Sequence, residues 1–77
     1  MTTTDVKTLF KQANARVISQ CKQLVADGVD KKTVYLINYK AVMLGYIDAL
    51  FDLELINVDK YQEYSNYIST LYSIYII

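Results

Sequence analysis

Few residues in this chain are of types that do chemistry. Asp48 and Asp52 lie one helical turn apart beside Gly45, and paired carboxylates can bind a divalent metal or transfer protons. The chain has no histidine, and no third metal ligand or nucleophile–base pair stands at helical spacing from these carboxylates. We therefore expect no catalytic residue, no metal and no cofactor, and we interpret the two aspartates as part of a solvated strip or as partners of lysines at a helix crossing.

The single cysteine, Cys21, lies on one helical face with Val17 and Leu24. A buried cysteine commonly acts as a small hydrophobic residue, whereas a redox role needs exposure and a lowered pKa. One thiol cannot form an internal disulfide, and a free thiol suits a reducing compartment. The N-terminus lacks the basic and apolar regions of a secretory signal. We expect a cytoplasmic protein.

Tyrosine is the unusual component, with eight among 77 residues. Five of them fall in the last seventeen positions, namely Tyr61, Tyr64, Tyr67, Tyr72 and Tyr75. Tyrosine combines apolar area with a hydroxyl and has only two side-chain torsions to immobilise, so protein interfaces favour it. Two interpretations stay open. These tyrosines form a partner-binding surface, or they line the rim of a small core with their hydroxyls in water.

Charge is divided between the two halves of the chain, although the eight basic and eight acidic side chains cancel. Residues 1–40 carry seven basic and three acidic side chains, whereas residues 41–77 carry one basic and five acidic. One interpretation is that the halves attract each other within the fold. The other is a basic ridge (Lys7, Lys11, Asn14 and Lys22) that meets an acidic protein or RNA. The net charge of zero removes the simplest argument for nucleic acid.

Apolar spacing predicts a first helix over about residues 4–27. Val6, Phe10, Ala13, Val17, Cys21 and Leu24 recur at steps of three and four, which is one face of a helix. Gly28 can take the positive φ that ends a helix, and Val29 would then contact Leu24 in a Schellman motif.

A second helix is predicted over about residues 31–54, with Asp30 as its N-cap. It is apolar around most of its circumference, and the exception is a strip of Asn38, Ala41, Gly45, Asp48 and Asp52. A helix that is apolar nearly all round is normally buried by more than one neighbour.

A third helix is predicted over about residues 58–75, capped by Asn57. Tyr61, Tyr64, Ile68, Leu71 and Tyr75 repeat at steps of three and four. Its composition is rich in Tyr, Ile, Ser and Thr, which favour strands, but no second strand is evident to pair with it.

These segments predict one all-α domain over residues 1–77, either a three-helix bundle or a helical hairpin with a third helix folded back. Because so small a monomer would leave part of the second helix wet, we expect a homodimer. The candidate residues for the dimer contact or a helix crossing are Ala41, Gly45, Tyr46 and Leu50. The charge-free run from Tyr64 to Ile77 is too short and too polar to span a bilayer, so we expect no membrane partner.

No family signature emerges from the residues. The function that we expect is a small non-enzymatic interaction module that docks on another protein and inhibits or modulates it, of the kind that phages and plasmids commonly encode. Tyr64, Tyr67 and Tyr72 would supply binding energy, while Lys7 and Lys11 would steer encounter. The alternative is a small dimeric nucleic-acid-binding regulator that uses the lysines of the first helix.

Overall fold

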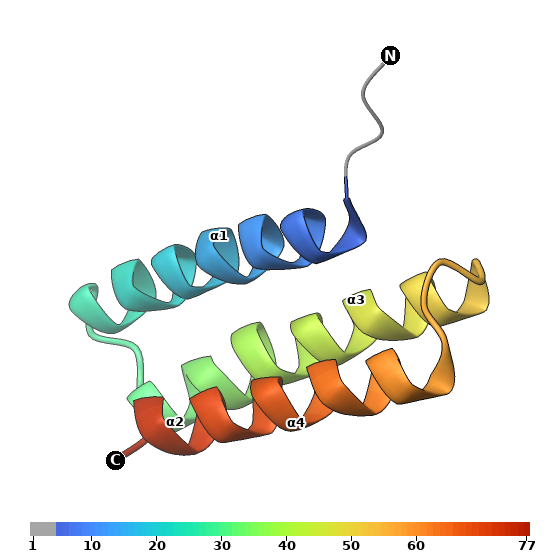
Figure 1. Ribbon diagram of the computed structural model, residues 1–77. Helices are drawn as coiled ribbons and strands as arrows, with labels where there is room; N and C mark the ends of the chain where they lie inside the picture. Colours follow the sequence, from blue (N-terminus) through green and yellow to red (C-terminus); the bar gives the residue numbers. More distant parts are fainter. Residues whose placement is uncertain (1–4) are drawn as a thin grey trace.

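The computed structural model describes residues 5–77 and arranges them as three helical rods (Figure 1). The first is α1 (Val6–Ala26), and the last is α4 (Val58–Tyr75). Between them runs a continuous middle helix from Lys31 to Asp52, made of α2 (Lys31–Val34), the π-helical turn η1 (Tyr35–Lys40) and α3 (Ala41–Asp52). The described residues contain no strand, so the predicted all-α class is confirmed. The predicted start of the first helix, Thr4, lies outside the described residues.

Helix starts follow from polar side chains that accept hydrogen bonds from free backbone N–H groups. Asp30 accepts from the backbone N–H of Thr33 at 3.0 Å, and Asn57 accepts from that of Lys60 at 2.9 Å. Both residues are the N-caps that the sequence predicts. The first helix begins after Asp5, whose carboxylate accepts a longer bond of 3.3 Å from the backbone N–H of Lys7.

The end of α1 has the predicted Schellman geometry. Gly28 has φ +99°, a conformation that strains side chains other than glycine. The backbone N–H of Gly28 donates to the carbonyl of Val25 at 3.0 Å, and that of Val29 donates to the carbonyl of Leu24 at 3.1 Å. The chain therefore reverses within a few residues and starts the middle helix alongside α1.

The middle helix ends two residues earlier than the sequence pattern predicts, at Asp52 rather than residue 54. Glu54 adopts a left-handed conformation with φ 60°, and the backbone N–H of Leu55 donates to the carbonyl of Leu50 at 2.9 Å. This is a second Schellman-type ending, formed here without glycine. The left-handed conformation costs a residue with a Cβ on the order of 1 kcal/mol, so a glycine is normally expected at such a position. Because a glutamate stands here, the local sequence does not reveal where the helix ends.

The middle helix contains a π-helical turn that contributes two tyrosines to the core. In this turn the backbone N–H of Ala41 donates to the carbonyl of Leu36, five residues earlier. Tyr35 and Tyr39 of this turn are both buried, together with Met43 and Ile47 of α3. The rings of Tyr35 and Tyr75 stack with centroids 5.0 Å apart, so the turn packs against the end of α4.

Both α1 and α4 pack on the middle helix, but they do not pack closely on each other. Among the described residues no Cα atom of α1 lies within 8 Å of one in α4. In Figure 1 the two helices follow different sides of the middle helix. The core therefore fills the angle between the three helices: Phe10, Ala13, Val17 and Cys21 from α1; Val34, Tyr35, Tyr39, Met43, Ile47 and Leu50 from the middle helix; and Ile56, Tyr64 and Ile68.

The outer face of the middle helix stays uncovered. Ile37 and Val42 are 57% and 48% exposed, and no atom lies within 4 Å of the position that a Cβ on Gly45 would take. By length and composition this helix is apolar enough to cross a membrane, a test that core helices of globular proteins also pass. The inner face of the middle helix forms the core between α1 and α4, and neither of these helices covers its outer face.

Candidate functional site

A groove opens where α1 and α4 diverge. Its volume is about 380 Å³, within the range of about 300–1,000 Å³ that ligand sites occupy. It is lined by Lys7, Phe10, Lys11, Asn14 and Ala15 of α1 and by Glu63, Tyr64 and Tyr67 of α4. Four of the candidate partner-binding residues, Lys7, Lys11, Tyr64 and Tyr67, therefore meet in one place.

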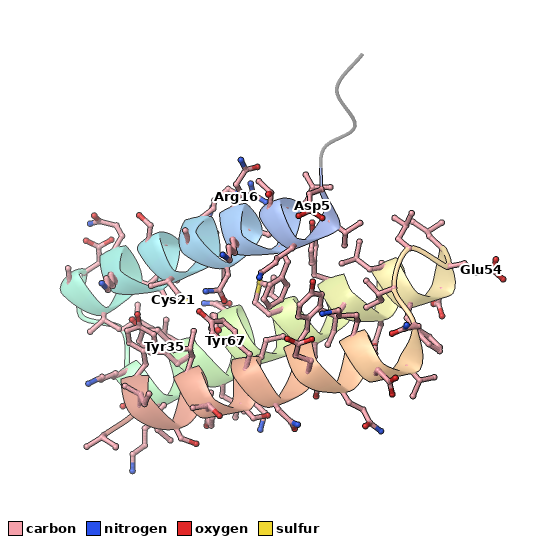
Figure 2. The ribbon with its side chains drawn as sticks, in the orientation of Figure 1. Asp5, Arg16, Cys21, Tyr35, Glu54 and Tyr67 are labelled. Carbon is pink, nitrogen blue, oxygen red and sulfur yellow. The ribbon has the colours of Figure 1, made fainter. Side chains whose placement is uncertain are left out.

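Aromatic rings form the apolar floor of this groove and bridge the two helices. Phe10 stacks on Tyr64 with ring centroids 4.4 Å apart and planes 7° apart. Tyr67 meets the edge of Phe10 at 5.9 Å and lies between α1 and α4 (Figure 2). Tyr64 is buried, whereas Tyr67 is 48% exposed. Tyr64 thus belongs to the core, and Tyr67 is the aromatic side chain that the groove offers to a partner.

Asn14 is the polar residue on the groove wall, and it is only 7% exposed. Its Oδ1 accepts a hydrogen bond of 2.7 Å from the hydroxyl of Tyr39. Burial raises the pKa of Tyr39, so this hydroxyl stays protonated and donates. No hydrogen bond joins the Nδ2 of Asn14 to another described residue. Since no fully buried side-chain nitrogen or oxygen is unsatisfied among these residues, Nδ2 keeps some exposure to solvent, in a residue that lines the groove.

The rim of the groove has unpaired positive charge. Within residues 5–77 the single ion pair joins Lys60 to Glu63 at 2.9 Å, so the acidic residue of the rim is already neutralised. Lys7 and Lys11 are exposed, and no carboxylate of the described residues lies within 4.0 Å of either ammonium. No side-chain ion pair joins the two halves of the chain among these residues, although the ammonium of Lys31 donates a hydrogen bond of 3.0 Å to the backbone oxygen of Ile77.

The other three candidate tyrosines lie away from the groove. The hydroxyl of Tyr61 donates to Asp48 at 2.5 Å, and Tyr72 lies under the ammonium of Lys40, 4.9 Å from the ring centroid. Tyr75 stacks on Tyr35. These side chains hold α4 to the middle helix, so the five tyrosines do not form one continuous surface.

The paired carboxylates lie in a separate hollow of about 550 Å³ beside Phe51 and Tyr61. The bond to Asp48 raises the pKa of Tyr61, which holds the phenol in its protonated form rather than activating it. No group of three or more metal-ligating side chains gathers anywhere in the described residues. Cys21 is fully buried, and burial raises its pKa, which agrees with its interpretation as a small hydrophobic residue.

The candidate dimer residues divide between the surface and the core. Ala41 and Gly45 are exposed on the outer face of the middle helix, and Tyr46 is half-buried at its edge. Leu50 is buried in the core of one chain, so it is not available to a second copy. No helix of the same chain crosses at Gly45. Of the two predicted roles of this residue, a helix crossing and a dimer contact, only the dimer contact stays a prediction.

Two residues central to the groove, Phe10 and Asn14, are interpreted differently in the sequence analysis. Phe10 is assigned there to the core face of the first helix, and Asn14 to the basic ridge. The sequence does mark Asn14 as unusual, because it is a polar residue between Ala13 and Val17 on a largely apolar stripe. A polar side chain on a buried stripe needs a hydrogen-bond partner, which here is Tyr39.

Comparisons with protein-family models, curated proteins and solved structures find no match to this chain. The functional proposal below therefore rests on the geometry of the molecule.

Truncating the two groove tyrosines should have different consequences for stability. Tyr64→Ala removes a buried ring and should lower the free energy of unfolding by about 3 kcal/mol. Tyr67→Ala should cost less than about 1 kcal/mol, because the ring is half exposed and its aromatic contact is an edge contact with Phe10. Urea denaturation followed by circular dichroism measures both. Equal losses would show that Tyr67 is a core residue and not a free binding side chain.

Proposed function

We propose that this protein is a small non-enzymatic interaction module of the cytoplasm that docks on another protein through the groove between α1 and α4. Occlusion of the partner's own site is the simplest way for so small a chain to inhibit or modulate it. The observation that carries the proposal is the meeting of exposed Tyr67 with Lys7 and Lys11 at one groove.

The make-up of the groove supports docking through a few side chains. Binding energy at protein interfaces is concentrated in a few residues, with tyrosine among the commonest. Rim charges raise the association rate and select partners of opposite charge. Tyr67 fits the first role, and the unpaired Lys7 and Lys11 fit the second.

A nucleic-acid-binding regulator is the rival class. Phosphate binding depends on several basic side chains that follow a backbone. Only two of the α1 lysines line the groove, while Lys22 lies near the opposite end of α1, 5.9 Å from the ring centroid of Tyr75. This spacing favours a protein partner.

The protein should retain a partner from host extract in a way that depends on the groove. The immobilised full chain would be compared with Tyr67→Ala, with the double variant Lys7→Glu, Lys11→Glu, and with Tyr72→Ala as a matched tyrosine outside the groove. Quantitative mass spectrometry should find a protein that is retained by the wild type and Tyr72→Ala and reduced at least about tenfold by the two groove variants.

Two outcomes would contradict this function. One is a partner retained equally by all four proteins, which would place the docking surface elsewhere. The other is recovery of RNA or DNA whose binding falls steeply with salt and depends on Lys7 and Lys11 but not on Tyr67, which would establish the rival class.

We also propose that two copies associate through the outer face of the middle helix. Ile37, Ala41, Val42 and Gly45 form an exposed uncharged stretch there, which the exposed carboxylates of Asp48 and Asp52 border about one and two turns beyond Gly45. Ala41 and Gly45 have small side chains or none, which allows a second helix to approach closely. This face is distinct from the groove, so a dimer would leave both grooves open.

Sedimentation equilibrium tests the dimer directly. The wild type should give a mass near twice 8.9 kDa at micromolar protein. Gly45→Lys should give a monomer that remains folded, because the added side chain points into open space within one chain and fills the space that a second helix would occupy. Thr70→Lys, exposed on α4, is the control for added charge and should stay dimeric. A monomeric wild type would refute the dimer.

A further inference from the structure

We infer that the groove between α1 and α4 receives a partner segment in which an apolar side chain is followed closely by a carboxylate, that is, an acidic peptide motif with an aromatic or aliphatic residue. This inference rests on the proposed docking function and specifies the chemistry of the partner. It is carried by three features of the groove: a fixed amide donor, two unpaired ammonium groups and an apolar floor.

The amide donor is Asn14. Its Oδ1 is occupied by the hydroxyl of Tyr39 at 2.7 Å, which restrains the amide and leaves Nδ2 as its free donor in a residue that lines the groove. Nδ2 carries only donors, so it can bind an acceptor such as a carboxylate or carbonyl oxygen, but not an ammonium group. Asn14 is more than nine-tenths buried, so the donor is held in place before the partner arrives.

The charges on the rim extend this preference from acceptors to anions. Lys7 and Lys11 are four residues apart, so both lie on the face of α1 that borders the groove. Glu63 is the acidic residue of the lining, and Lys60 neutralises it at 2.9 Å. Asp5 lies close by, but its carboxylate caps the positive end of α1. A carboxylate entering the groove therefore meets a net positive rim.

The floor selects an apolar neighbour for that carboxylate. The face of Phe10 that meets Tyr64 is already occupied, with ring centroids 4.4 Å apart. The half-exposed ring of Tyr67 remains available, and Ala15 leaves room beside it. A nucleotide base could stack on Tyr67 as well, but the two ammonium groups and the amide lie in one compact groove and do not follow a phosphate backbone.

Nuclear magnetic resonance of the isotope-labelled full chain can test this chemistry with three blocked dipeptides. The probes are N-acetyl-Phe-Glu-amide, N-acetyl-Phe-Gln-amide and N-acetyl-Phe-Lys-amide, which share the ring and differ in charge. The acidic probe should shift the side-chain amide signals of Asn14 and the ring signals of Tyr67. It should bind at least about fivefold more tightly than the glutamine probe, since charge-assisted hydrogen bonds are about twice as strong as neutral ones.

Matched variants separate the groove lysines from overall charge. The double variant Lys7→Glu, Lys11→Glu should lose the preference for the acidic probe. The double variant Arg16→Glu, Lys32→Glu makes the same change in net charge outside the groove and should keep it; Arg16 points away from α4 in Figure 2. Circular dichroism of both variants should match the wild type, because all four side chains are exposed.

The results decide between this inference and the broader function. Equal binding of the three dipeptides, or shifts that avoid Asn14, would overturn the inference. If a partner in host extract still depends on Tyr67, the groove docks a protein by other chemistry and only the inference fails. A single-stranded oligonucleotide that shifts Lys7 and Lys11 and outcompetes the acidic dipeptide would overturn the inference and the docking function together.

Discussion

The structure depends on one constraint, which is that the middle helix is the shared neighbour of both α1 and α4. Its inner face supplies the largest part of the core, including the fully buried Tyr39, Met43 and Ile47. Since α1 and α4 pack on this helix and no Cα pair between them comes within 8 Å, side chains must span the remaining space. The stack of Phe10 on Tyr64 does so at one end and Lys22 above Tyr75 does so at the other. The groove is the part of that space that side chains do not fill.

The hydrogen bond between Asn14 and Tyr39 connects this packing to the groove. A polar pair in a small core is costly unless both members are satisfied. Tyr39 is satisfied inside the core, whereas Asn14 is satisfied on one side by Tyr39 and on the other by the solvent of the groove. The same contact that orders the core therefore presents a directed donor at the surface. The inference about the chemistry of the partner uses that double role.

Much of the fold could be predicted from the sequence, because its signals are local. Asp30 and Asn57 are good N-caps, Gly28 permits positive φ, and the apolar steps of α1 and α4 identify their buried faces. The end at Glu54 could not be predicted, since no glycine or asparagine marks that left-handed residue. The π-helical turn could not be predicted either, because no local pattern marks it and one of its residues, Tyr35, packs on the distant Tyr75 of α4.

The candidate site was predictable only in part. Lys7, Lys11, Tyr64 and Tyr67 could be selected by residue type, but their meeting depends on how far α1 and α4 diverge, which no sequence spacing encodes. For the same reason the sequence did not separate Tyr64, which is buried against Phe10, from the exposed Tyr67. The uncovered face of the middle helix was predictable, since the helix is apolar around more of its circumference than two neighbours can cover.

Nuclear Overhauser contacts in solution test the central claim most directly. The account predicts strong contacts between the ring protons of Phe10 and Tyr64, together with contacts from the side-chain amide of Asn14 to the ring of Tyr39, and none between the backbones of α1 and α4. Contacts between the two backbones beside Phe10, or the absence of any contact between the two stacked rings, would contradict it.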